Sequence, residues 1–160
     1  MDYKIEVDTL LHKLGKTLDL PKLALDAYNR CILIFDEKIV LNVELDEVNG
    51  ILIVYSYVSV VPFEGRERIF EMLLEANFFW KDSGEATLSI DKQTQTVVMA
   101  RRFELPLKES CSLEDSLGEF IDNVEIWSKK LEGLALEAET LGKAENLSKN
   151  QVNQNRDKLR

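Results

Sequence analysis

The sequence predicts a single α+β domain in the order α-β-β-β-α-β-β-α, in which a twisted antiparallel sheet packs against helices. Two observations predict this fold. Apolar residues recur at helical spacing in three segments, and two blocks rich in β-branched and aromatic residues lie between those segments. With 160 residues the chain is long enough for one domain with a substantial core, and its 3 Pro and 7 Gly argue against a low-complexity chain.

The first helix is expected from Val7 to about Leu18. Its apolar face consists of Val7, Leu10, Leu11, Leu14 and Leu18. Pro21 limits this helix, because the residue before a proline avoids helical dihedrals.

Three antiparallel strands are expected near residues 28–35, 39–48 and 51–61, with breaks at Asp36-Glu37 and Asn49-Gly50. The Asn-Gly pair predicts a hairpin with a type I′ turn, in which both central residues have positive φ. Both faces of the third strand are apolar, so we expect it to be covered on both sides.

A second helix is expected from Glu64 to Asn77, followed by strands over "EATLSI" and residues 96–103. In the first of these strands Leu88 and Ile90 are expected to point inward. The final helix is expected to begin at Ser112. Its apolar stripe consists of Leu113, Leu117, Phe120, Ile121, Val124, Trp127 and Leu131.

The net charge of −9 is unevenly distributed. Residues 143–160 hold five bases and two acids, a net charge of +3, which leaves −12 for residues 1–142. Phosphate backbones bind clustered Lys and Arg, so this acidic body argues against nucleic acid as a partner. Because few apolar residues follow Leu141, we expect a folded domain at 1–142 and a mobile tail at 143–160.

The sequence predicts a cytoplasmic protein without membrane insertion. No apolar run reaches the roughly 18 residues that span a bilayer, and the first residues lack the pattern of a signal peptide. Cys31 and Cys111 have no paired spacing, which indicates a reducing compartment.

We expect no enzyme activity, and hence no catalytic residue, cofactor or metal. The only histidine, His12, is expected on the polar side of the first helix, and one histidine cannot complete a triad alone. Zinc needs about four Cys or His ligands, and the chain has three. A small-ligand sensor or enzyme with a closed pocket is an alternative, which the lack of converging polar residues disfavours.

Three stretches carry a family resemblance: "LLHKLGKTLDLPKLALDAYNRCILIFD", "LLEANFFWKDSGEATLSID" and "FIDNVEIWSKKL", at residues 10–36, 73–91 and 120–131. In this order, over about residues 5–132, they resemble the signatures of class I type III secretion chaperones, the Tir-chaperone (CesT-like) family. Asp19 and Asn29 occupy positions where that family often has glycine. Asparagine tolerates the positive φ that such a turn requires.

The resemblance implies a bacterial cytoplasmic homodimer that binds the N-terminal region of secreted effector proteins. It would hold that region extended and deliver it to components of the secretion apparatus. Physically, an extended partner can add to a sheet edge through main-chain hydrogen bonds, while pockets select its side chains. The alternative is an acidic dimeric adaptor or regulator that binds a folded partner and has no role in secretion.

The apolar residues of the first helix and the first two strands are the candidates for the cargo groove. Some should pack in the core, and a register shift of one residue would exchange the two sets. The candidates are Leu10, Leu11, Leu14, Leu18, Leu33, Phe35, Leu41 and Val43.

The three consecutive aromatics at the end of the second helix are too many for one helix face. The resemblance implies that the second helix forms the dimer interface, where a partner subunit would cover the surplus ring. Alternatively, all three rings lie in a monomer core under the last two strands. The predicted interface residues are Phe70, Leu73, Leu74, Asn77, Phe78, Phe79 and Trp80.

Overall fold

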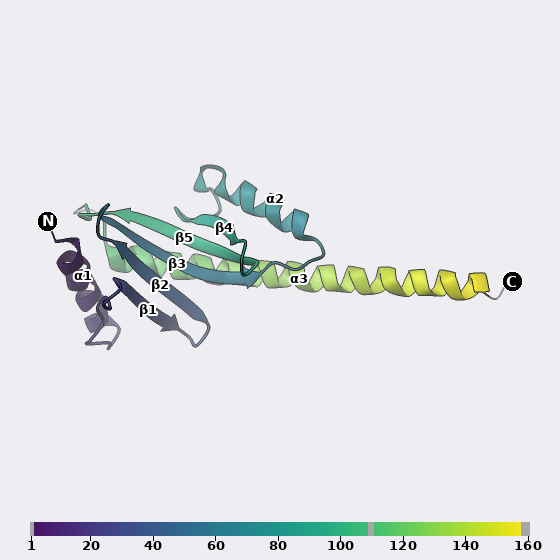
Figure 1. Cartoon of the computed structure of the whole chain (residues 1–160), viewed down its shortest axis with the longest axis horizontal. Helices are drawn as coiled ribbons and strands as arrows, with labels where there is room; N and C mark the ends of the chain where they lie inside the picture. The colour runs from purple at the N-terminus through teal and green to yellow at the C-terminus, as the bar shows by residue number, and fades with distance from the viewer. Residues whose placement is uncertain (1, 109–110, 158–160) are drawn as a thin grey trace.

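The computed structural model describes the backbone of residues 2–108 and 111–157, and side chains in these ranges up to residue 143 except 138, 141 and 142. It confirms the α+β class and the expected order of elements (Figure 1). A short 3-10 helix, η1, was not expected. The elements are α1 (Tyr3–Thr17), β1 (Arg30–Phe35), β2 (Ile39–Asp46), β3 (Ile51–Val60), α2 (Arg66–Asn77), η1 (Phe78–Trp80), β4 (Thr87–Asp91), β5 (Thr96–Glu104) and α3 (Leu113–Asp157).

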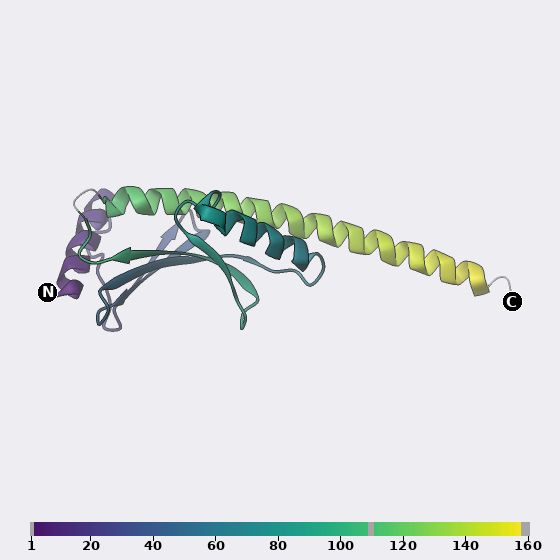
Figure 2. The ribbon, with the colours of Figure 1, turned by 90° about the horizontal axis from the view of Figure 1, so that it is seen from above.

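The five strands form one antiparallel sheet in the order β1-β2-β3-β5-β4, so β1 and β4 are its two edges. Figure 2 shows α3 crossing one face of this sheet, with α1 at one end. In Figure 1 the opposite face points toward the viewer, and none of the described helices covers it. The sheet therefore has one face in the core and one open face.

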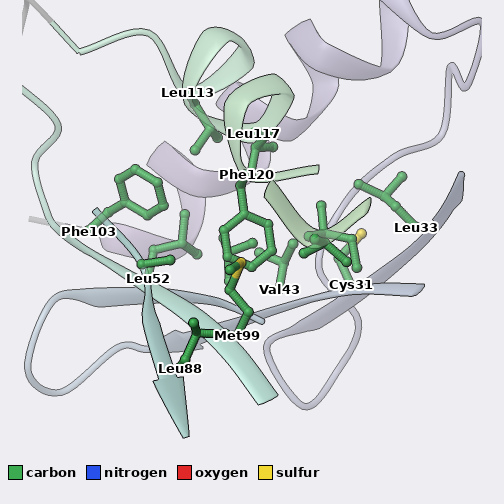
Figure 3. Packing of buried hydrophobic residues seen from close by; sticks show 14 of the residues in the cluster. Cys31, Leu33, Val43, Leu52, Leu88, Met99, Phe103, Leu113, Leu117 and Phe120 are labelled. Atoms are coloured by element: carbon green, nitrogen blue, oxygen red, sulfur yellow. The ribbon is translucent and has the colours of Figure 1, made fainter. Parts of the chain in front are cut away.

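The core lies between the sheet and α3 (Figure 3). Alternate residues of the strands point into it, including Leu33, Val43 and Met99. Phe120 and Trp127 of α3 are among its largest fully buried side chains, and the predicted stripe of α3 is buried except for the half-buried Ile121. This amphipathic face explains why α3 packs on the sheet.

The turn at Asn49-Gly50 differs from the prediction. β2 and β3 are paired from Asp46 and Ile51, so four residues connect them, and Gly50 has positive φ (63°) whereas Asn49 does not. The Asp46 carboxylate accepts hydrogen bonds from the backbone and side chain of Asn49, which stabilises this longer turn. The two adjacent positive φ values that a type I′ turn requires occur instead at Asp36 and Glu37.

Two further expectations concern the surroundings of β3 and the tail. Within the described chain β3 is covered on one face only, so the prediction of cover on both faces is wrong for the single chain. Helix α3 continues without a break past residue 142 and projects beyond the sheet to Asp157 (Figure 1). The mobility of residues 143–160 stays a prediction, and residues 158–160 lie outside the described residues. Among the described helices, none is long and apolar enough to cross a membrane.

Candidate partner-binding surfaces

Most of the predicted groove residues belong to the core. Five of them are buried: Leu11, Leu14, Leu33, Leu41 and Val43. The other three, Leu10, Leu18 and Phe35, are half-buried and pack against the core. The prediction could not separate core from groove in β1, because this strand reads Cys-Ile-Leu-Ile-Phe and both of its faces are apolar. Contact of any of these eight residues with cargo stays a prediction.

The strand residues that alternate with these buried ones form the open face. On β1, Ile32 and Ile34 are 62% and 66% exposed, compared with 3% for Leu33 between them. Pairing places Asn42 and Val40 of β2 beside them. The open face continues across the sheet through Val40, Asn42, Glu44, Ile53, Tyr55, Tyr57, Val98, Ala100 and Arg102. Apolar side chains thus extend from the β1 edge to the middle of the sheet.

The backbone of β1 is only partly paired on its outer side within the described chain. Arg30 turns both backbone groups away from β2, since its N–H donates to the Asp26 carboxylate (2.9 Å) and its C=O accepts from the Asp26 N–H (2.7 Å). The backbone groups of successive residues in a strand point alternately to its two sides. The N–H and C=O groups of Ile32 and Ile34 therefore also point outward. Within the part of the chain that the structure describes, these four groups have no hydrogen-bond partner.

A hollow of about 480 Å³ lies beside this edge, between β1 and the loop after α1. Its lining consists of Leu20, Pro21, Lys22, Leu23, Ile32, Leu33 and Ile34. An extended segment that paired with Ile32 and Ile34 would therefore place side chains against apolar walls. The edge, the hollow and the adjoining open face together provide main-chain and side-chain contacts.

The loop that forms one wall of the hollow is tightly fixed. Gly15 allows the close approach, because a Cβ there would lie 2.4 Å from the Leu20 carbonyl oxygen. The Leu20 N–H donates to the Gly15 carbonyl (2.7 Å), and the Leu25 N–H donates to the Asp8 carboxylate (2.8 Å). Asp19 adopts positive φ (56°) in this loop, as a glycine would.

A polar ladder connects β1, β2 and β3 on the open face. The Arg30 guanidinium lies 3.3 Å from the Glu44 carboxylate, and the Tyr55 hydroxyl donates to the same carboxylate (2.8 Å). Partial burial and the Glu44 carboxylate raise the pKa of Tyr55 to about 12, since both oppose formation of a phenolate. Tyr55 thus keeps its proton and its hydrogen bond to Glu44 into the alkaline range, and the ladder adds side-chain contacts across the three strands.

A second exposed surface lies at the end of α2. The aromatic patch consists of Leu74, Phe78, Phe79 and Trp80, and its three rings are 66%, 78% and 56% exposed in sequence order. The alternative of a monomer core that holds all three rings is therefore wrong. Leu74 lies in the last turn of α2, and Phe78 directly follows the last residue of that helix. The centres of the Phe78 and Phe79 rings lie 4.4 Å apart.

Three of the predicted interface residues are not part of this patch. Leu73 is buried in the core, and Phe70 is half-buried, with the Arg66 guanidinium 5.2 Å from its ring centre. The half-buried Asn77 makes two hydrogen bonds to β4. The helical period puts Leu73 and Leu74 on different faces, and Leu74 is the exposed one of the two. Their place in a dimer interface stays a prediction.

The aromatic patch has an unusual backbone. Phe79 and Trp80 both have positive φ (53° and 52°), which is unfavourable for bulky side chains. Such conformations persist where surrounding contacts offset their cost, yet both rings are largely exposed in the single chain. Trp80 also forms one wall of a hollow of about 540 Å³ that reaches the open face at Ile53 and Ala100.

The expected position of His12 on the polar side of α1 is confirmed, and Cys31 lies in the core. His12 is exposed and Cys31 is buried. Burial is the main cause that raises the pKa of the Cys31 thiol, and the nearby charges of Asp26 and Asp8 raise it further. Cys111 is half-buried, with its Sγ 3.9 Å from the Ser116 hydroxyl. Among the described residues, no group of three or more His, Cys, Asp or Glu side chains is arranged to hold a metal ion.

Comparison with known proteins agrees with this architecture. A profile of the Tir chaperone protein (CesT) family matches residues 9–128. The structure is similar to a chain in the crystal structure of the ExsC–ExsE complex, with a TM-score of 0.70 and 26% identity over 82% of this chain and 97% of that chain. No curated protein sequence matches the chain.

Two further structures share the fold at lower identity. One is the HopA1–SchA chaperone–effector complex, with a TM-score of 0.63 and 15% identity over 79% of this chain and 95% of that chain. The other is the heterodimeric ExoU–SpcU complex from the type III secretion system of Pseudomonas aeruginosa, with a TM-score of 0.56 and 20% identity over 78% and 93%.

Proposed function

Because the chain belongs to the Tir chaperone protein (CesT) family and is a type III secretion effector chaperone, we propose that its β1 edge binds the N-terminal segment of a secreted effector in extended form. One observation carries this proposal. The outward backbone groups of Ile32 and Ile34 lack partners within the described chain, and they border an apolar hollow. An extended segment satisfies both features at once, since it supplies backbone donors and acceptors together with apolar side chains.

The bound segment has a short strand-like part. The Asp26 side chain and N–H already satisfy the backbone of Arg30, and the Asp36-Glu37 turn ends β1 on the other side. Only Ile32 and Ile34 are left to pair, which limits the added strand to about three to five residues. The rest of the effector segment would lie over the open face, where Val40, Ile53 and Tyr57 offer apolar contacts.

The aromatic patch serves a different purpose in this proposal, the formation of a homodimer. Four exposed apolar side chains at one helix end make a self-complementary contact possible across a two-fold axis. Burial of Phe79 and Trp80 by a second copy would also offset the cost of their backbone conformation. Each protomer then keeps its own β1 edge free for an effector.

Catalysis is not part of the proposed function. The chaperone would act in the bacterial cytoplasm by holding the effector segment unfolded and presenting it to components of the secretion apparatus. Neither step requires a covalent reaction, a cofactor or a metal.

Hydrogen exchange measured by NMR tests the proposal directly. Addition of a synthetic peptide that copies the N-terminal segment of an effector encoded beside this gene should slow exchange of the Ile32 and Ile34 amides at least tenfold. The same peptide with a proline at its central position should bind more weakly, because proline removes a backbone donor. Capture of a folded domain of the effector without protection of these amides would instead support the adaptor alternative.

A further inference from the structure

The side chain of Asn77 occupies the place of a neighbouring strand at the other edge of the sheet. Its Nδ2 donates to the Leu88 carbonyl (2.8 Å), and the Leu88 N–H donates to its Oδ1 (2.9 Å). An antiparallel strand would make the same pair of bonds with a residue of β4. We propose that Asn77 closes the β4 edge to strand addition and thereby directs extended partners to β1, an inference that rests on the proposed function.

The two edges differ in the backbone groups that they leave available. Because Leu88 turns its N–H and C=O away from β5, alternation along the five-residue β4 makes Ile90 the only other residue with outward groups. With Leu88 occupied, an incoming strand would find one residue to pair with. At β1 it finds two, beside an apolar hollow.

The chemistry of the asparagine side chain suits this role. A primary amide carries a donor and an acceptor in one plane, as a peptide group does, so a single side chain satisfies both backbone groups of Leu88. Asn77 is the last residue of α2, which runs beside β4 (Figure 1) and brings this amide to the edge. An aspartate would keep the acceptor and lose the donor.

The test compares the full chain with the variants Asn77→Ala and Asn77→Asp. A synthetic peptide that copies β2, residues 39–46, serves as the strand probe, and NMR measures amide exchange at Ile32, Ile34, Leu88 and Ile90. In the natural chain the probe should slow exchange at Ile32 and Ile34 only. In Asn77→Ala the Leu88 amide should exchange at least tenfold faster than in the natural chain when no probe is present. Addition of the probe should then slow exchange of the Leu88 and Ile90 amides.

Asn77→Asp provides a second reading if the alanine variant is poorly folded, and its effect should be intermediate. The matched control is Asn49→Ala, which removes an amide that donates to the Asp46 carboxylate (2.7 Å) in the turn between β2 and β3, away from β4. This control should leave the β4 amides insensitive to the probe.

The inference is overturned if the probe protects Leu88 in the natural chain, or if it protects Leu88 in neither Asn77 variant. The proposed function fails by a different result. An effector peptide that leaves Ile32 and Ile34 unprotected in the natural chain would refute binding at β1, whatever the Asn77 variants show.

Discussion

Adjacent residues on opposite faces of β1 allow partner binding to be separated from stability. Ile34 is 66% exposed, so Ile34→Ser removes apolar surface that only a partner can cover. Full burial of an isoleucine side chain contributes about 1.5–3 kcal/mol. The exposed two thirds therefore contribute about 1–2 kcal/mol to effector binding, and the dissociation constant should rise about 5- to 30-fold.

Leu33→Ser should have the opposite effect. Leu33 is 3% exposed, so serine leaves a cavity and buries a hydroxyl group. The free energy of unfolding should fall by about 3–5 kcal/mol, a large part of the stability of a small domain. The folded fraction of this variant should lose less affinity for the effector peptide than Ile34→Ser does, because Leu33 lines the hollow but is only 3% exposed.

Urea denaturation followed by circular dichroism gives the free energy of unfolding, and isothermal titration calorimetry with the effector peptide gives the dissociation constant. Val48→Ser is the control, because Val48 is almost fully exposed in the loop between β2 and β3, beyond the part of β2 that pairs with Ile32 and Ile34. It should change neither quantity. The reasoning is refuted if Ile34→Ser binds like the natural chain, or if it loses as much stability as Leu33→Ser.

Four other predictions concern the rest of the chain. Phe79→Asp should raise the dimer dissociation constant at least about tenfold, because it places an unpaired charge in the aromatic patch. Sedimentation equilibrium at micromolar concentration measures this, and a natural chain that is monomeric there would disprove the dimer. Gly15→Ala should displace the loop beside the hollow and lower stability by about 1–3 kcal/mol, measured by urea denaturation, and should weaken effector binding in calorimetry. Tyr55→Phe should lower the free energy of unfolding by about 1 kcal/mol at neutral pH. The folded state raises the pKa of Tyr55 from 10.0 to about 12. The stabilisation that its protonated hydroxyl contributes is therefore complete below pH 10 and is lost between pH 10 and 12. Tyr55→Phe should accordingly lose less of its free energy of unfolding than the natural chain in urea titrations at those pH values. Removal of residues 143–160 should leave the thermal midpoint and effector binding nearly unchanged, and a large loss in calorimetry would show that this segment docks on a partner or on the body.

The pattern of apolar residues predicted the elements well where one face only is apolar. The stripe of α3 fixes a single buried face, and the alternation in β4 fixes Leu88 as inward. In β1 the residues on both faces are apolar, so no local rule distinguishes Ile34 from Leu33. That choice depends on how β1 pairs with β2 and on where α3 packs, which are long-range properties.

The candidate site shows the same limit. Side-chain patterns indicated α1, β1 and β2 as the elements of the site. They could not show which backbone groups of β1 point outward, because that direction follows from the hydrogen bonds between Asp26 and Arg30. The role of Asn77 was also hidden, because its partner Leu88 is eleven residues away and bonds through its backbone. Consecutive aromatics gave a clearer signal, since three rings exceed what one helix face can bury.

The two kinds of contact at the β1 edge have different consequences for effector choice. Hydrogen bonds to the backbone of Ile32 and Ile34 accept any extended sequence without proline, so they contribute affinity and little discrimination. Discrimination must then come from side chains that enter the hollow lined by Leu20, Pro21 and Leu23 or that lie on the open face. Exchange of these wall residues between related chaperones should therefore change which effector binds, whereas the strand-pairing geometry should stay the same.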